Sequence, residues 1–179
     1  KKVGTKFIYV IHGGGLTFRM DPRFNFFKKV SNRIIRWDNT NKIENVFLNL
    51  SPTLPVIKLK NLNKGKYCSI VYNECSKYLL KFLTGPSLDQ SIHLFNEIIQ
   101  FINKLEPEIK EKIRFRTKMN IGHNSEKKFS EIFGKKHVDK ISVKNNFAKT
   151  ILNSKLIVVT YPQTAFSEAM YSNTPTILI

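Results

Sequence analysis

Short runs of apolar, β-branched and aromatic residues alternate along the chain with segments whose apolar positions recur at helical spacing. The first pattern is typical of buried strands and the second of helices that cover a sheet. The clearest helix is 88–105, where apolar residues repeat every three or four positions and Ser87 is placed to cap the N-terminus. The pattern predicts strands at 6–11, 32–37, 46–50, 67–72, 113–117, 140–143, 156–160 and 176–179, and further helices at 125–133, 146–152 and 163–171.

The order of these elements predicts the fold class. Strands and helices that alternate with short connections are typical of an α/β protein with a Rossmann-like parallel sheet and helices on both faces. The Pro-containing segment 51–55 and the polar, turn-forming segment 61–65 make 51–65 the linker candidate, and we place the linker at 56–65, between a first part, 1–55, and a second, 66–179. The chain lacks an initiator Met and ends on an apolar run, so we expect a fragment of a longer protein whose second part is truncated.

Composition narrows the class of protein. With 41% hydrophobic and 24% charged residues over 179 positions, the chain is too apolar for an intrinsically disordered protein. The sequence contains neither an apolar stretch long enough to span a membrane nor a secretory signal. Its two cysteines, Cys68 and Cys75, fit neither a zinc knuckle nor a redox pair. We therefore predict a reduced, cytoplasmic compartment.

The formal net charge of +17 is the most unusual property of the composition. Such a surplus favours a polyanionic partner, either nucleic acid, an anionic membrane surface or a phosphorylated substrate. The alternative is genome composition, because only six of the thirty basic residues are Arg and the chain is rich in Lys, Asn and Ile. The sequence carries no RNP, helix-turn-helix or zinc-finger signature, and we expect no nucleic-acid partner.

His12, Gly13, Gly14 and Gly15 follow the first predicted strand. Glycine has no side chain to keep a ligand away, so the N–H groups of this loop can face an anion. His12 is suited to act as a general base or to bind phosphate. The alternative is a tight turn with a histidine that packs against the protein. The chain has neither the G-x-S-x-G of esterases nor the Lys-Ser/Thr of a P-loop, which excludes both classes.

A second candidate segment runs from Thr160 to Glu168, where a buried strand ends and a helix begins near Pro162 or Gln163. The free N–H groups of the first helical turn, together with the Thr164 hydroxyl, form an anion site that the helix dipole strengthens. Glu168 lies one turn later on the same side and can accept hydrogen bonds from ribose hydroxyls. The alternative is an ordinary capped helix.

The strand predicted at 113–117 carries two arginines. If Phe115 faces the core, Arg114 and Arg116 share the opposite face. In a sheet covered on both sides, burying two arginines without anions is costly, so at least Arg116, near the strand end, should reach a phosphate or carboxylate. The alternative is a solvated edge strand.

Together these segments resemble a known family. The residues His12–Gly15, 34–37, 116–122, 156–169 and 173–177 are similar to those of bacterial surface-carbohydrate transferases, and 156–169 is the most specific patch. That family is similar to GT-B glycosyltransferases and, more distantly, to CDP-glycerol glycerophosphotransferases and capsule polysaccharide transferases.

The resemblance implies a two-domain GT-B-like architecture, with Rossmann-like domains that face each other across a cleft. Residues 1–55 would be the end of the acceptor-side domain, and 66–179 the start of the nucleotide-sugar domain. His12, with the loop Gly13, Gly14 and Gly15, would act on the acceptor side as the catalytic base. The donor would be held by Arg116, Gln163, Thr164 and Glu168.

We therefore predict a transferase that moves a sugar or a glycerol-phosphate-like group from a nucleotide-activated donor to a surface-polysaccharide acceptor, either a glycan or a lipid-linked one. We expect no metal and no cofactor, because the helix dipole and Arg can balance the leaving diphosphate. The enzyme would work in the cytoplasm, and its basic surface is compatible with peripheral attachment to the inner membrane. The alternatives are a GT-B-like nucleotide-sugar epimerase and a basic nucleic-acid-binding domain.

Overall fold

The computed structural model describes residues 4–10, 22–36, 45–47, 65–74, 87–117, 123–139, 146–162 and 164–179. The chain divides into two compact units, Lys1–Val56 and Ile57–Ile179. Among the described residues, none of the helices combines the length and the apolar character that crossing a bilayer requires.

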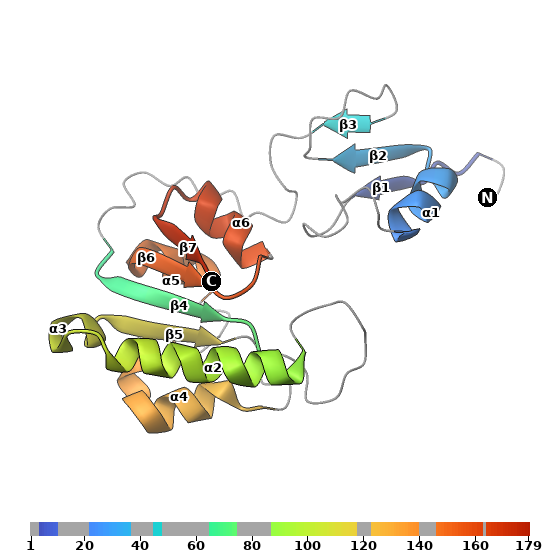
Figure 1. Ribbon diagram of the computed structural model, residues 1–179. Helices are drawn as coiled ribbons and strands as arrows, with labels where there is room; N and C mark the ends of the chain where they lie inside the picture. Colours follow the sequence, from blue (N-terminus) through green and yellow to red (C-terminus); the bar gives the residue numbers. More distant parts are fainter. Residues whose placement is uncertain are drawn as a thin grey trace. The chain divides into compact units, whose positions relative to one another are not determined.

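The first unit contains a small parallel sheet with the strand order β1-β2-β3 (Figure 1). The Tyr9 and Phe27 rings stack with their centroids 4.1 Å apart, which packs the helix against the sheet. Ile34 is the buried apolar residue of the central strand. The described elements are β1 (Ile8–Val10), α1 (Pro22–Val30), β2 (Arg33–Arg36) and β3 (Asn45–Phe47).

The second unit is built on a four-stranded parallel sheet with the order β5-β4-β6-β7. Its elements are β4 (Tyr67–Tyr72), α2 (Leu88–Asn103), α3 (Pro107–Lys110), β5 (Ile113–Thr117), α4 (Ser125–Phe133), the 3₁₀ helix η3 (Lys135–His137), α5 (Phe147–Asn153), β6 (Ser154–Val159), α6 (Thr164–Tyr171) and β7 (Thr176–Leu178).

The direction of strand addition reverses at β4. The chain adds β5 on one side of β4, and a single parallel bridge from Phe115 to Val138 extends the sheet beyond β5. It then crosses over and adds β6 and β7 on the other side of β4. In open α/β sheets, ligands bind beyond the carboxyl ends of the strands where such a reversal occurs. The carboxyl ends of β4 and β6 are therefore the expected position of a site.

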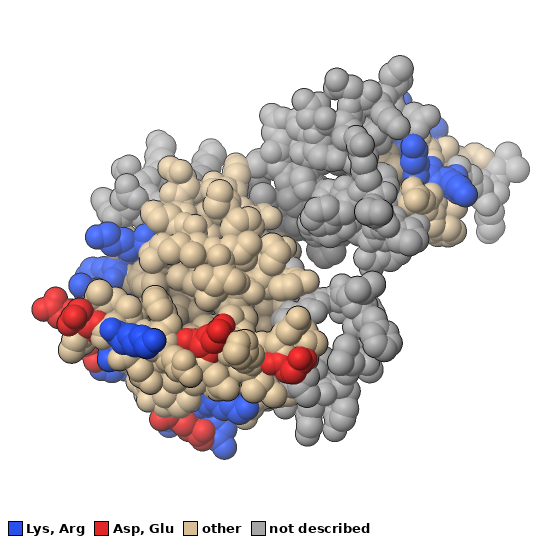
Figure 2. Space-filling model, in the orientation of Figure 1, with Lys and Arg blue, Asp and Glu red and all other residues tan. Residues whose placement is uncertain are grey.

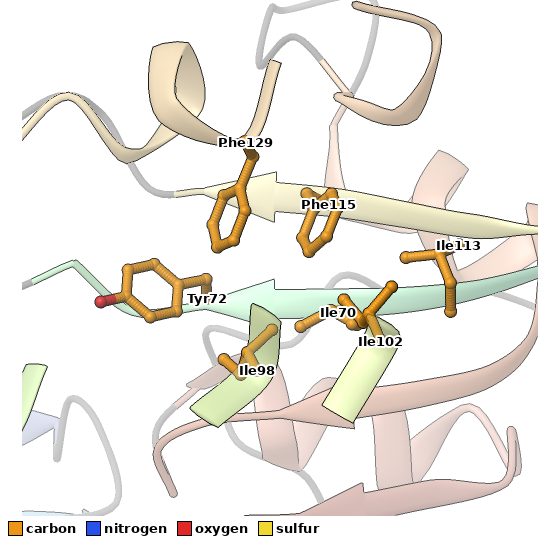
Figure 3. Close-up of a cluster of buried hydrophobic side chains, with 7 residues drawn as sticks. All are labelled: Ile70, Tyr72, Ile98, Ile102, Ile113, Phe115 and Phe129. Atoms are coloured by element: carbon orange, nitrogen blue, oxygen red, sulfur yellow. The ribbon is translucent and has the colours of Figure 1, made fainter. Parts of the chain in front are cut away.

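Helices cover both faces of this sheet. On one face, α2 and α4 enclose a cluster in which the Phe115 and Phe129 rings stack at 4.1 Å, and Tyr72 lies at the end nearest the tip of β4 (Figure 3). On the other face, α5 and α6 pack over Ile157 and Val159 of β6. Alternate residues of β4 contribute to the two faces, which is the pattern of a strand buried on both sides.

A close backbone contact joins the starts of β4 and β6. A Cβ added to Gly65 would lie 2.1 Å from both the carbonyl carbon and the oxygen of Ser154, so only glycine fits there without a shift. The neighbouring Lys66 N–H donates to the Asn153 carbonyl at 2.9 Å. Position 65 therefore fixes how closely the two central strands approach at their beginnings.

The predicted α/β class, with parallel sheets and helices, is confirmed. The helix predicted at 88–105 is α2, where the Ser87 N–H donates to the Gln90 side chain at 2.9 Å as in a capping box. The sequence analysis did not predict α1 or the short α3, although both begin with Pro, a residue favoured in the first turn. The strand predicted at 140–143 lies outside the described residues. The two-domain GT-B architecture stays a prediction.

Candidate functional site

A cavity of about 300 Å³ opens at the carboxyl ends of β4, β5 and β6, beside the N-terminus of α6. This is the edge of the sheet where the strand order reverses. Three of the residues predicted to bind a donor line it together, namely Arg116, Thr164 and Glu168. The remaining lining residues are Val71, Tyr72, Asn73, Thr117, Phe147, Val159, Tyr161 and Ala165.

Arg116 is the only basic residue among those that line this cavity in the described part of the chain, and it is only 7% exposed. Its Nη1 donates to the Thr150 hydroxyl at 3.0 Å, and its guanidinium lies over the Phe147 ring at 5.7 Å. Burial lowers the pKa of Arg116, while the charges of Asp139 and Glu168 raise it. A guanidinium remains protonated under these influences, so the cavity holds a fixed positive charge.

The hydroxyl that receives this hydrogen bond belongs to a buried polar network. Ser154 Oγ lies 2.6 Å from the Thr150 carbonyl oxygen and 2.7 Å from Ser69 Oγ. Because a hydroxyl has one proton, Ser154 donates to the carbonyl and accepts from Ser69. Thr150, Ser154 and Ser69 are each no more than 2% exposed. The network links α5 to β6 and β4 and thereby fixes the residue that orients Arg116.

Glu168 and Thr164 lie one turn apart on α6, and both reach the cavity, as the sequence predicts. Burial raises the pKa of the Glu168 carboxyl, and the positive charge of Arg116 lowers it in part. The Glu168 carboxyl and the Arg116 guanidinium, which both line the cavity, therefore interact electrostatically. Thr164 is the first residue of α6, and both Thr164 and Ala165 line the cavity, so the N-terminus of this helix borders it.

A threonine at the end of β6 fixes the backbone beside the cavity. The Thr160 hydroxyl accepts a hydrogen bond from the Asn73 N–H at 2.9 Å, and the Thr160 N–H donates to the Val71 carbonyl at 3.2 Å. These bonds hold the tips of β4 and β6 together where the strand order reverses. Asn73 follows β4 directly and lines the cavity.

Thr117, at the end of β5, adds an observation that points to a ligand. Its side chain is 1% exposed and lines the cavity, yet its hydroxyl has no hydrogen-bond partner within the described residues. Buried hydroxyls in proteins are nearly always paired with protein, water or ligand. A polar group in the cavity would satisfy the Thr117 hydroxyl.

The structure separates the two arginines of β5. Arg114 lies near the start of the strand, where its Nη1 donates to the carbonyls of Glu111 and Ile113 at 2.9 and 2.6 Å. Its guanidinium also stacks over the Tyr67 ring at 4.1 Å. These contacts satisfy its charge far from the strand's carboxyl end. Only Arg116 of the pair lines the cavity, so the strand position decides which arginine is available to a ligand.

Five of the predicted site residues lie outside the described residues, namely His12, Gly13, Gly14, Gly15 and Gln163. Their roles stay predictions. Within the described ranges, no group of three His, Cys, Asp or Glu side chains could hold a metal ion.

Several lining residues were not assigned a role from the sequence. Asn73 and Thr117 had a usable signal, since each is a polar residue at or just after the end of a predicted strand. Phe147 had none, because only the crossover from β5 to β6 brings α5 beside Arg116. Tyr161 lies in the candidate segment from Thr160 to Glu168, but the sequence analysis assigned it no function.

The described part of the second unit does not form one continuous basic region on the face in view (Figure 2). Figure 2 shows basic and acidic side chains interspersed over the part of the second unit that contains α2 and α4, while the area around α6 and β7 carries neither. Met170 and Tyr171 of α6 and Ile177 of β7 are exposed apolar residues. The +17 charge therefore gives no direct indication of a ligand on this face.

In chemical terms the cavity combines one fixed cation, one carboxylate, a helix N-terminus and three aromatic rings, those of Tyr72, Phe147 and Tyr161. Such a set fits a ligand with an anionic group, hydroxyls and a flat ring. A family model described as LIC12162 family transferase matches residues 1–179, and the chain therefore belongs to this family. No curated protein and no solved structure matches the chain.

Proposed function

As a member of the LIC12162 transferase family, the chain needs both a donor and an acceptor, and we propose that its donor is a nucleotide-activated compound bound in the cavity at the carboxyl edge of β4, β5 and β6. One observation carries this proposal. Arg116, Thr164 and Glu168, which come from a strand end and from the first turns of α6, converge on one cavity at the reversal of strand order.

Each residue has a role that suits its chemistry. Arg116 and the N–H groups at the start of α6 bind the diphosphate, since both present positive charge to an anion. The Thr164 hydroxyl donates to a phosphate oxygen, with Gln163 beside it, and the Glu168 carboxylate accepts hydrogen bonds from the ribose hydroxyls. The rings of Phe147 and Tyr161 offer apolar surface to the base.

The transfer step then follows from charge stabilisation. The bond that breaks is the C–O bond between sugar and diphosphate when a sugar is transferred, and the P–O bond within the diphosphate when a glycerol-phosphate unit is transferred. In both cases negative charge grows on the leaving phosphate oxygen, and Arg116 with the N-terminus of α6 stabilises it. His12 takes the proton from the attacking acceptor hydroxyl, and the loop Gly13, Gly14 and Gly15 leaves room for the acceptor beside it. This scheme uses no metal.

The finer features of the proposal rest on the resemblance described above. The transferred group is a sugar or a glycerol-phosphate-like unit, and the acceptor is a glycan or lipid-linked precursor of a surface polysaccharide. The first unit belongs to the acceptor-side domain and the second to the donor domain of a GT-B-like enzyme. The protein acts in the cytoplasm, at the inner membrane surface where lipid-linked acceptors are found.

Nucleotide binding tests the donor site directly. We would screen UDP, CDP, GDP, ADP and their sugar derivatives by thermal shift, since a ligand of the folded state raises Tm with its concentration. Arg116→Lys keeps the charge but loses the two-pronged donor geometry and should weaken binding at least about fivefold. Arg114→Lys, on the same strand but outside the cavity, is the matched control and should leave the affinity unchanged.

Turnover assays test the division of roles. Glu168→Ala should weaken nucleotide binding, whereas His12→Ala should reduce turnover with little effect on that binding. Equal losses of both parameters in both variants contradict this scheme. An altered sugar nucleotide formed without acceptor would indicate an epimerase instead. Polynucleotide binding that falls steeply with salt and that no nucleotide competes for would indicate a nucleic-acid-binding domain.

A further inference from the structure

A second cavity, of about 260 Å³, lies on the other side of the tip of β4. Residues of α2 and α4 line it, whereas α5 and α6 border the first cavity. Among the described lining residues, Tyr72 alone borders both. The second cavity therefore faces the α2 and α4 side of the sheet and has a separate set of polar groups.

The first of these groups is a buried carboxylate. Glu74, which is 3% exposed, accepts a hydrogen bond from the His123 N–H at 2.7 Å on Oε1 and from the Ser125 N–H at 3.3 Å on Oε2. Ser125 is the first residue of α4, so a negative charge already occupies the N-terminus of this helix. A second anion there would be repelled, while each carboxylate oxygen can still accept a further hydrogen bond.

Two further polar atoms at this cavity lack partners within the described residues. They are Ser91 Oγ, in a side chain that is 4% exposed, and His123 Nε2. The Ser91 carbonyl is already engaged, because it accepts a hydrogen bond from the Tyr72 hydroxyl at 2.9 Å. Buried polar atoms without partners are rare in native proteins. Their common position at one cavity indicates a ligand that supplies several hydrogen-bonding groups.

The remaining described lining residues combine apolar side chains with the Asn96 amide and the Lys128 ammonium. The Phe95 ring lines the cavity, with Ile92 beside it, and the Lys128 ammonium lies over that ring at 5.7 Å. Among the described lining residues, the Glu74 carboxylate and the Lys128 ammonium balance each other. The cavity thus offers an aromatic face, a carboxylate that accepts hydrogen bonds, and the unpartnered Ser91 Oγ and His123 Nε2. These groups together match a ring that carries hydroxyls on its edges and C–H groups on its faces.

We propose that the cavity between α2, α4 and the tip of β4 binds a neutral polyhydroxylated ring, a single sugar unit. The Glu74 carboxylate accepts from a sugar hydroxyl, Ser91 Oγ and His123 Nε2 bond to neighbouring hydroxyls, and the Phe95 ring contacts the C–H face. This site goes beyond the proposed function, because it requires no nucleotide and leaves Arg116, Thr164 and Glu168 unused.

Saturation-transfer NMR on the full chain tests this site. The probes are the methyl glycosides of D-glucose, D-galactose and D-mannose, together with N-acetyl-D-glucosamine and, as a charged comparison, inorganic phosphate. At least one sugar should bind with a millimolar Kd. Ser91→Ala should weaken that binding about fivefold or more without lowering Tm, because it removes a hydroxyl that has no partner among the described residues.

Two further variants make the outcome decisive. Ser130→Ala, on α4 but not among the lining residues, should leave the sugar affinity unchanged. Ile92→Trp should abolish binding, since position 92 lines the cavity yet is 50% exposed and tolerates a larger side chain. The proposal is overturned if none of the sugars binds at about 50 mM, if phosphate displaces the sugar, or if Ser91→Ala and Ile92→Trp bind normally. Nucleotide binding in the same variants reports separately on the donor site.

Discussion

The two faces of the sheet in the second unit are built from different chemistry. The face under α2 and α4 buries a cluster of seven hydrophobic residues in which aromatic rings stack on one another. The face under α5 and α6 buries four hydrophobic residues, and beside them Arg116, Thr150, Ser154 and Ser69. Apolar burial stabilises a fold directly, whereas a buried cation must be compensated by hydrogen bonds and nearby charge. The comparison indicates that the first face contributes most of the stability and the second positions a charge.

The strongest test of this comparison removes a ring from the apolar face. Phe115 is fully buried between Phe129 and Phe133, with ring centroids 4.1 and 5.1 Å away. Phe115→Ala should lower the free energy of unfolding by about 3–5 kcal/mol, since it leaves a cavity that the core cannot refill. Denaturant unfolding measures the change. Phe101→Ala, at a ring that is 58% exposed on α2, is the control and should change it by no more than about 0.5 kcal/mol.

A smaller effect is expected on the polar face. Thr150→Val keeps the shape of the side chain but removes the hydroxyl that accepts from Arg116, so the free energy of unfolding should fall by about 1.5–3 kcal/mol. Nucleotide affinity should fall as well, because the guanidinium loses its orientation. Thr150→Ser retains the hydroxyl and should preserve most of both properties. A Thr150→Val variant with unchanged affinity would show that this network does not position Arg116.

The smallest effect concerns the pH dependence that Glu168 gives to this face. Its pKa is raised above the ordinary value of 4.5, so above that pH the folded state binds more protons than the unfolded state. The stability that this group contributes is therefore lost as pH rises from about 4.5 through the raised pKa. Glu168→Gln lacks this loss, so its stability relative to the natural protein should increase across that window and then level off.

The size of that pH effect is limited by solvent. Because the Glu168 side chain is half-buried, we expect a change of only a few tenths of a kcal/mol, about the size of other screened interactions. Thermal unfolding at a series of pH values measures it. A relative stability that decreases with rising pH would show that attraction to Arg116 outweighs burial at this carboxylate.

The sequence was most informative where one physical signal dominates. The helical period of 88–105 and the capping signal at Ser87 predicted α2, and the apolar runs predicted the strands of the second unit. Arg116, Thr164 and Glu168 were found because the carboxyl ends of parallel strands and the helix starts that follow meet at one edge. α1 was missed because its three phenylalanines, at positions 24, 26 and 27, give only a weak helical period.

The rest of the site depends on contacts between distant segments. Phe147 and Arg116 are 31 positions apart, and no pattern in either segment indicates that they meet. The hydrogen bond between Thr160 and Asn73 likewise joins segments separated by 87 positions. The second cavity was not predicted at all, since the unpartnered atoms of Ser91 and His123 become visible only once α2 and α4 are packed on the sheet.

The contact between Gly65 and Ser154 implies that the enzyme can be inactivated from a distance. Any larger residue at 65 pushes the beginnings of β4 and β6 apart, and Ser154 is the residue whose hydroxyl bonds to the carbonyl of Thr150. The displacement would pass through Thr150 to the guanidinium of Arg116 at the opposite end of the sheet. A genetic screen for loss of function should thus recover substitutions of Gly65, a residue that lines neither of the two cavities.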